Sequence, residues 1–274
     1  MICQNDIERN GFAIGRNLLS PDEIARLRRA LVTHFQHSWQ PEGLGKHQPN
    51  AAVEIPALSW VFTHPPILAF LREQYGRPDL VFTGNCDAHM NMLSWWHKDT
   101  SDNRGGSLPG DYFSREDCNL YRVGIYLQDH PVRDGLTVRL GSHRSRSLAT
   151  GDIETLLTRA GDVIVFDSRL THAGQFANSL HRLILRAGSR LRCAALITRM
   201  RATIKRLASG PDKLSIFCTY GTPGPASDYY CAFEYAAKKE RNVAGATYLP
   251  AALIADLRRS GVDFCPAMDP FRPK

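Results

Sequence analysis

The 274-residue sequence predicts a mainly β protein, an antiparallel barrel or sandwich with helices packed outside it. Three observations lead to this prediction. From about residue 80 the chain consists of short β-type runs separated by turn residues. These runs do not alternate with helical patterns, as a parallel α/β sheet would require. The composition, 43% hydrophobic and 22% charged, is that of an ordinary globular protein, so residues 1–274 are expected to form one domain.

The first helix is expected at 18–35, after a short strand at 11–19. Ser20 is a favourable N-cap, Pro21 suits the first helical position, and Glu23 completes a capping box. Apolar side chains then recur at helical spacing, at Ile24, Leu27, Leu31 and Phe35. The local signals therefore agree on an amphipathic helix.

A second helix is expected at 67–76, ending at Gly76, after a Gly/Pro/His-rich connection at 40–50. Runs rich in β-branched and aromatic residues predict strands at 80–84, 88–96, 120–128, 136–140, 162–168 and 213–220. The polar stretch 101–117, which contains Gly and Pro, is expected to be a loop. A last helix is expected at 250–261.

Positive charge is concentrated in one segment of the chain. The net charge is +7, and residues 168–211 alone contain nine Lys or Arg and no Asp or Glu. Within this segment the pattern predicts an amphipathic basic helix, at about 186–210, inserted between two strands. The first interpretation is a solvated helix face, the second a lid over an anionic substrate, and the third a contact with a membrane surface. Because the charge is local, nucleic-acid binding is not expected.

The sequence also predicts a compartment. The N-terminus lacks a basic region followed by an apolar one, and no apolar run approaches the roughly 18 residues of a membrane span. The seven cysteines are scattered, without a C-x-x-C pair. These features predict reduced thiols in a cytoplasmic protein that has no transmembrane segment.

The stretch "SWWHKDT" places His97 and Asp99 two residues apart, a spacing that points both side chains to the same side of a strand. Such a pair often arises by chance, and alone it is more simply a solvated loop pair. A third candidate, His172, follows the apolar strand in "AGDVIVFDSRLTHAGQ". Two imidazoles and one carboxylate on one face of a metal suit Fe(II) that must also bind a co-substrate and dioxygen. The three residues together therefore suggest an iron site.

Five stretches, in order, resemble landmarks of the phytanoyl-CoA dioxygenase family: "SWWHKDT", "YRVGIYLQDH", "GLTVRLGSHR", "AGDVIVFDSRLTHAG" and "IFCTYG". The third is similar to the family's Pro-Gly-Ser-His turn, with Leu140 in place of the proline. The resemblance implies a double-stranded β-helix (jelly-roll, cupin-like) core flanked by helices. It also implies Fe(II) as cofactor, 2-oxoglutarate as co-substrate, and His97, Asp99 and His172 as the iron ligands.

The resemblance further implies a cation that anchors the 2-oxoglutarate carboxylate. Counting from the distal histidine indicates Arg182. Strand register instead indicates Lys213, at the start of what resembles the family's final core strand, with the basic segment as an insertion. Arg186 is a less favoured candidate. Thr137 resembles a core-strand position that donates a hydrogen bond to the co-substrate.

Other residues are expected around the same site. Asp167 and Arg169 are interpreted either as supports that fix the tautomer of His172 or as a simple pair. The residues expected to line the cavity are Asn91, Trp96 and Arg122.

The expected activity is oxidation of a small organic molecule by Fe(II), 2-oxoglutarate and dioxygen, with release of succinate and carbon dioxide. Hydroxylation is the simplest outcome, and an anionic substrate is a candidate because of the basic segment. Asp99 keeps the carboxylate that halogenating relatives replace, so halogenation is not expected. Two alternatives stay open. One is a metal enzyme of the wider cupin class that does not use 2-oxoglutarate, and the other is a non-catalytic binding module whose basic helix contacts an anionic partner.

Overall fold

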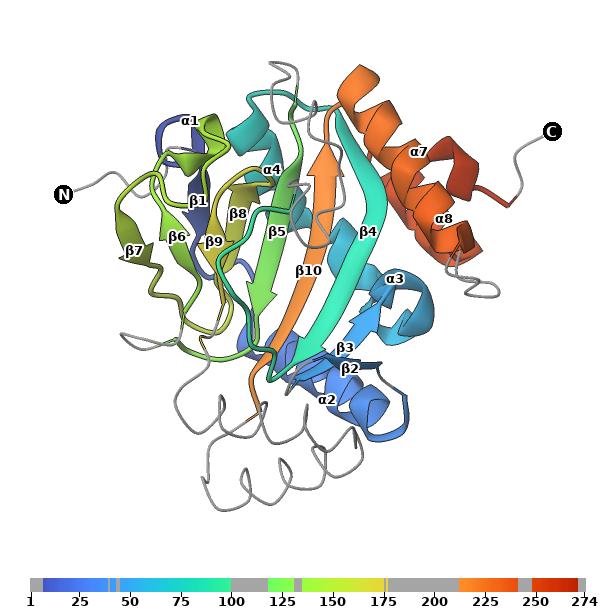
Figure 1. Cartoon of the computed structure of the whole chain (residues 1–274). Helices are drawn as coiled ribbons and strands as arrows, with labels where there is room; N and C mark the ends of the chain where they lie inside the picture. The colour runs from blue at the N-terminus through green and yellow to red at the C-terminus, as the bar shows by residue number, and fades with distance from the viewer. Residues whose placement is uncertain are drawn as a thin grey trace.

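The computed structural model describes residues 7–38, 40–42, 45–99, 118–130, 135–174, 176, 212–240 and 248–270. Two mainly antiparallel sheets pack against each other, and helices cover the outer face of the larger sheet (Figure 1). The predicted loop 101–117, the predicted basic helix at about 186–210, and Arg182 lie outside the described residues.

The larger sheet brings together strands from both ends of the chain. Its order is β1 (Phe12–Gly15), β8 (Val163–Asp167), β5 (Tyr121–Tyr126), β10 (Leu214–Gly221), β4 (Leu80–Met90), β3 (Gly45–Pro49) and β2 (Gln40–Glu42). The short strand β11 (Val262–Phe264) runs parallel to β4. The smaller sheet has the order β7 (Ile153–Thr155), β6 (Thr137–Arg139) and β9 (His172–Ala173). This is the double-stranded β-helix, mainly β with flanking helices, that the resemblance implies.

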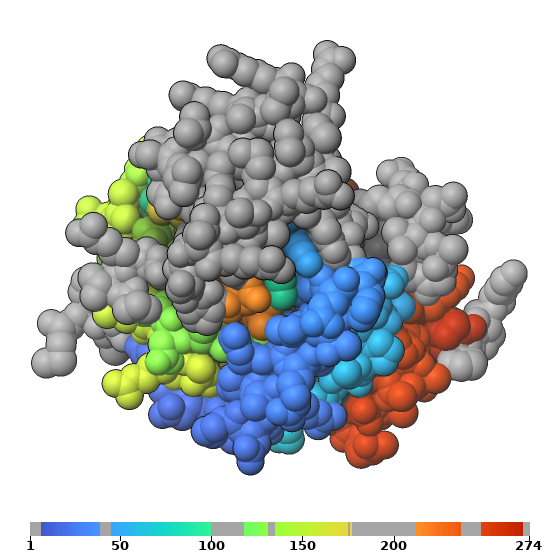
Figure 2. Space-filling model, turned by 90° about the horizontal axis from the view of Figure 1, so that it is seen from below, coloured from blue at the N-terminus to red at the C-terminus, as the bar shows by residue number. Residues whose placement is uncertain are grey.

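The helices belong to three stretches of the chain. Near the N-terminus are α1 (Ile7–Asn10), α2 (Pro21–His37), α3 (Ala51–Glu54), the 3-10 helix η1 (Pro56–Thr63) and α4 (Pro65–Tyr75). The 3-10 helix η3 (Ser142–Arg144) lies between strands of the smaller sheet, and α7 (Pro225–Glu240), α8 (Ala251–Arg259) and the 3-10 helix η4 (Pro266–Met268) follow β10. Seen from below, η1 lies between α2 and α8 and contacts both (Figure 2). Among the described residues, no helix has the length and apolarity needed to span a membrane.

The alternation of side chains along the strands separates two apolar cores. On one face of the larger sheet, buried residues such as Phe82 of β4 and Ile216 of β10 pack against Leu31 of α2 and Leu257 of α8. Between the sheets, Phe12, Ile14, Ile164 and Phe166 pack against Leu136, Val138 and Leu156. The inner face of β4 and β10 remains only partly covered, because Asp87, His89 and Phe217 are all half-buried. The polar site described below opens onto this inner face.

Most predicted elements are present, with shifted ends. The predicted helix at 18–35 is α2, and Gly76 adopts the left-handed conformation that ends α4. The strands predicted at 80–84 and 88–96 are one strand, β4, from Leu80 to Met90, and the predicted part beyond Met90 is wrong because Asn91, with a φ of 55°, ends the strand. Five strands were not predicted, namely β2 and β3 within the connection at 40–50, β7, β9 and β11. The helices α1, α3 and α7 and the 3-10 helices were not predicted either.

Candidate metal centre

The three candidate ligands come together although they lie on segments far apart in sequence. The backbone N–H of His97 donates to the carbonyl of His172 at 3.0 Å, and the N–H of His172 donates to the carbonyl of His97 at 2.9 Å. The N–H of Asp99 donates to the carbonyl of Ser168 at 3.0 Å. The short segment 97–99 is therefore held against β9 as an additional edge of the smaller sheet.

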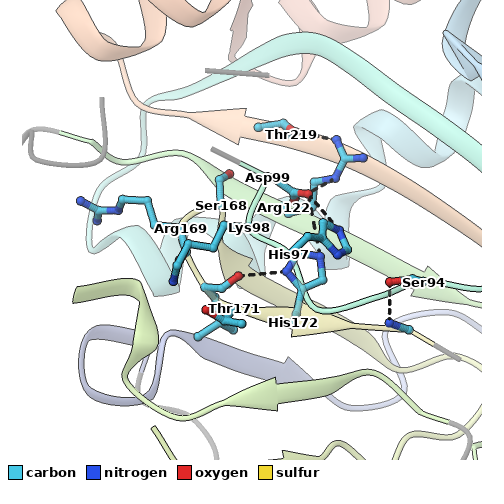
Figure 3. A network of polar contacts seen from close by, with 12 residues as sticks. Ser94, His97, Lys98, Asp99, Arg122, Ser168, Arg169, Thr171, His172 and Thr219 are labelled. Carbon is cyan, nitrogen blue, oxygen red and sulfur yellow. Dashed lines mark hydrogen bonds and ion pairs between the residues drawn. The ribbon is translucent and has the colours of Figure 1, made fainter. Parts of the chain in front are cut away.

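The ligand atoms of this group converge on one point (Figure 3). Oδ1 of Asp99 lies 3.7 Å from Nε2 of His97 and 3.8 Å from Nε2 of His172. All three atoms lie within 4.8 Å of one another. Metal bonds of about 2.1 Å place two ligand atoms of one ion at most about 4.2 Å apart, so both measured separations fit a single ion.

Both histidines are fixed in the tautomer that a metal requires. Nδ1 of His97 donates to the carbonyl of Trp95 at 2.6 Å, and Nδ1 of His172 donates to the carbonyl of Leu170 at 3.0 Å. A proton on Nδ1 leaves the lone pair on Nε2, which is the atom that faces Asp99. The backbone thus orients both imidazoles before any metal binds.

Protonation states also favour metal binding. Burial alone would raise the pKa of Asp99, but His172 and Arg122 lower it below its ordinary value. Burial, together with the neighbouring His97, lowers the pKa of His172 to about 4. An ionised carboxylate and a neutral imidazole are the forms that coordinate metals. The donor set therefore fits a divalent first-row metal.

Arg122 of β5 connects the centre to the larger sheet. Its Nε lies 3.7 Å from Oδ2 of Asp99, and its Nη2 donates to Oδ2 of Asp87 at 2.8 Å. The same guanidinium donates to Oδ1 of Asn85 and, at 3.1 Å, to Oγ1 of Thr219. The two carboxylates raise the pKa of Arg122 above its ordinary value. Arg122 thus lines the centre, as the sequence predicts, and its contacts with Asn85, Asp87 and Thr219 were not predicted.

Asp167 and Arg169 pair with each other, at 2.7 Å between Oδ2 and Nη2. The tautomer of His172 is set by the carbonyl of Leu170, so the prediction that Asp167 or Arg169 sets it is wrong. Their contribution is indirect. The N–H of Leu170 donates to the carbonyl of Asp167 at 2.8 Å, and this bond holds the turn that presents the Leu170 carbonyl.

Lys98 was not predicted, although it separates two of the candidate ligands. Its side chain is only 2% exposed, and Nζ donates to the carbonyls of Ser142 and Arg169 at 2.8 and 2.7 Å. Burial lowers its pKa to about 8. The signal for this role is its position, because the residue between i and i+2 on a strand points to the opposite side. Lys98 therefore ties the ligand segment to η3.

The candidates for binding 2-oxoglutarate are described in part. Lys213 directly precedes β10, and its backbone N–H donates to Oδ1 of Asn91 at 3.0 Å. By strand alternation its side chain leaves on the inner face, the side from which Thr219 reaches Arg122. Thr137 of β6 shares a hydrogen bond of 3.2 Å with Thr155. Arg182 and Arg186 lie outside the described residues.

Aromatic residues directly precede the ligand segment in sequence. Trp95, whose carbonyl accepts the His97 proton, has 57% of its surface exposed. The rings of Trp96 and Phe176 are 5.4 Å apart, and the guanidinium of Arg139 lies 5.0 Å from the centroid of the Trp96 ring. These residues form an aromatic rim beside the ligand segment.

No protein-family model and no curated protein matches this chain. Several solved structures share its fold. SnoK, a non-heme alpha ketoglutarate dependent carbocyclase from nogalamycin biosynthesis, has a TM-score of 0.56 at 16% identity, covering 79% of this chain and 81% of SnoK. SnoN, an epimerase from the same biosynthesis, has a TM-score of 0.55 at 17% identity, covering 79% and 80%.

A third structure is that of HygX from Streptomyces hygroscopicus with nickel, 2-oxoglutarate and hygromycin B bound. Its TM-score is 0.55 at 14% identity, covering 79% of this chain and 84% of HygX. At these identities the likeness establishes the fold. The chain has the double-stranded β-helix fold that it shares with these enzymes.

Proposed function

We propose that this protein is an Fe(II)- and 2-oxoglutarate-dependent oxygenase that acts on a small organic molecule. The observation that carries the proposal is the convergence of two preoriented imidazole Nε2 atoms and one ionised carboxylate oxygen, from His97, His172 and Asp99. The shared fold supports it, because SnoN has been solved with Fe3+ and alpha ketoglutarate, and HygX with nickel and 2-oxoglutarate.

Each residue has a defined task in this proposal. His97, Asp99 and His172 hold the metal on one face and leave its other positions open. Arg122 stabilises the ionised form of Asp99. Lys213 or Arg182 anchors the distal carboxylate of the co-substrate. Thr137 is the less favoured candidate for a hydrogen bond to it, because Val138, not Thr137, shares a face of the smaller sheet with His172. The bound iron and 2-oxoglutarate supply the oxidation by dioxygen, with release of succinate and carbon dioxide.

The type of oxidation is less specific than the cofactors. Hydroxylation of a C–H bond is the simplest outcome, but SnoN is an epimerase and SnoK a carbocyclase on the same fold. Retention of Asp99 as a carboxylate argues against halogenation. The exposed ring of Trp95, two residues before His97, is a candidate contact for the apolar surface of an organic substrate.

The partners, the cellular location and the redox state of the cysteines were also predicted from the sequence. A small-molecule partner, no nucleic acid, and a cytoplasmic location stay predictions. The described cysteines agree with the expectation of reduced thiols, because Cys86, Cys118, Cys218, Cys231 and Cys265 are all buried thiols that form no disulfide with one another.

The first test is an anaerobic titration of the metal-free protein with Fe(II) and then 2-oxoglutarate. The wild type is expected to develop the weak visible charge-transfer band of a chelated complex. His172→Ala is expected to lose the band, and His37→Gln, which removes an exposed histidine of α2, is expected to keep it. Iron that binds without a band would favour the cupin-class alternative. A protein that binds no iron would favour the binding module.

The same titration locates the anchor. Replacing a charge-assisted hydrogen bond to a carboxylate costs about 1.5–3 kcal/mol, or roughly 10- to 100-fold in affinity. Lys213→Met and Arg182→Met are therefore expected to differ, and the anchor is the residue whose loss weakens 2-oxoglutarate binding to this extent. Unchanged affinity in both variants would contradict both assignments.

A further inference from the structure

A second group of metal-type side chains lies on the inner face of the larger sheet. It consists of His47 of β3 and of Asp87 and His89 of β4. Asp87 and His89 are two residues apart on one strand, the same spacing as His97 and Asp99. All three are half-buried, and the proposed iron site does not use them.

The sheet register brings this group together. His47 lies directly opposite His89 in the antiparallel pair of β3 and β4, and their rings are 5.0 Å apart at 71°. Oδ1 of Asp87 lies 3.4 Å from Nε2 of His47. One ligand atom from each of the three residues lies within 4.8 Å of the others.

The separation of the His47 and Asp87 ligand atoms matches a tetrahedral ion. Bonds of about 2.1 Å place neighbouring ligands of a tetrahedral ion about 3.4 Å apart. The His47–Asp87 separation equals this value, and it is shorter than the 3.7 and 3.8 Å separations in the candidate iron centre. The His47 and Asp87 ligand atoms of the second group therefore lie closer together than the histidine and aspartate ligand atoms of the candidate iron centre.

The carboxylate of the group is ionised and oriented. Although burial opposes ionisation, a hydrogen bond with His47 and the charge of Arg122 hold the pKa of Asp87 well below its usual range. Arg122 donates to Oδ2, so Oδ1 faces His47. A hydrogen bond to the second oxygen of a ligating carboxylate is a common feature of metal sites.

We propose that His47, Asp87 and His89 form a second divalent-cation site, of the type that binds zinc, with a water molecule as the fourth ligand. Two imidazoles, one carboxylate and a water molecule form a donor set that Zn²⁺ accepts in tetrahedral geometry. The ion joins β3 to β4 and so fixes the edge of the sheet. The site shares no ligand with the proposed iron centre, although Arg122 contacts the carboxylates of both Asp87 and Asp99.

The test is a count of bound zinc. Metal-free protein is titrated with Zn²⁺ in competition with a chromophoric chelator, and the stoichiometry is confirmed by native mass spectrometry. The wild type is expected to bind two equivalents, one at each group. His89→Gln and His47→Gln are each expected to bind one equivalent, and the matched control His37→Gln is expected to bind two. Circular dichroism of each variant in chelator establishes that it is folded.

A second series of variants distinguishes zinc bound at the candidate iron centre from zinc bound at the second site. His172→Ala is expected to retain one equivalent, which the double variant with His89→Gln loses. A wild type that binds one equivalent, all of it lost in His172→Ala, would overturn the second site and leave the first intact. Two equivalents in both His89→Gln and His47→Gln would overturn it as well. If the wild type binds only one equivalent of zinc, and His89→Gln loses it, the result would support the second site and count against the first.

Discussion

Lys98 stands between two candidate ligands, but its charge is used elsewhere. The ammonium is buried against two backbone carbonyls, and its pKa is lowered to about 8. In the unfolded chain a lysine has a pKa of about 10.4. Between these values the unfolded state binds more protons than the folded state, so the stability that this group contributes rises with pH. This contribution to stability is complete above the pKa of the lysine in the unfolded chain. It is lost as the pH falls through the lower pKa of Lys98 in the folded protein.

Lys98→Met tests this linkage, because methionine keeps the apolar stem and removes the amine. Between pH 7 and pH 10 the wild type is expected to gain about 2 kcal/mol relative to the variant. The measurement is the free energy of unfolding of both proteins by urea at several pH values in this range. A constant difference across the range would contradict a lowered pKa at Lys98.

At the scale of single elements, α2 shows what local sequence can specify. Glu23 N–H donates to Oγ of Ser20 at 3.3 Å, and Ser20 N–H donates to Oε2 of Glu23 at 2.8 Å. These two bonds satisfy backbone donors that the first turn of a helix leaves without a partner. The cap is therefore a local device that can be removed without disturbing the core.

Ser20→Ala is expected to destabilise the protein by about 1 kcal/mol, because it removes the side-chain acceptor of the cap. Ser20→Thr keeps a hydroxyl at the same position and is the control. Urea unfolding should show a lower midpoint for Ser20→Ala with an unchanged slope. A midpoint equal to that of the wild type would mean that the capping box adds nothing to stability.

Elements that are specified by local signals can be predicted from the sequence, and elements that depend on pairing cannot. The helix α2 is predictable because its cap, its first-turn proline and its apolar spacing are all local. The end of β4 at Met90 is not, because only the left-handed Asn91 marks it within an otherwise apolar run. The strands β2 and β3 were missed because their pairing, β2 with β3 and β3 with β4, makes them strands, and their composition does not.

The candidate site follows the same logic. His97, Asp99 and His172 were found by spacing and by position after a strand. The links of Arg122 to Asp99 and Asp87 were not found, because they depend on the order of the strands, in which β10 lies between β5 and β4. The second group likewise depends on the register that places His47 opposite His89. Spacing within a strand, position after a strand and the family resemblance can be read from the sequence, whereas contacts that depend on strand order and register require the structure.

At the scale of the whole molecule, the larger sheet separates stability from chemistry. Its outer face packs on helices in one continuous apolar core, and its inner face carries Arg122, Asp87 and Thr219 next to the candidate metal centre. The ligands come from segments 97–99 and 172, which two backbone hydrogen bonds join. A metal at this centre adds bonds between these segments in the folded state alone, and so it should stabilise the entire fold.

The magnitude follows from mass action. A ligand that binds only the folded state at a hundred times its Kd stabilises that state by about 2.7 kcal/mol. For a chain of this size each kcal/mol raises the Tm by about 2–4 °C, so metal loading is expected to raise the Tm by roughly 5–10 °C. Calorimetry with Mn²⁺, which does not oxidise under these conditions, measures the shift in a His89→Gln background that removes the proposed second site. Asp99→Ala in the same background should abolish the shift, and a chelator should reverse it in the parent. A shift that persists in Asp99→Ala would place the stabilising ion elsewhere in the molecule.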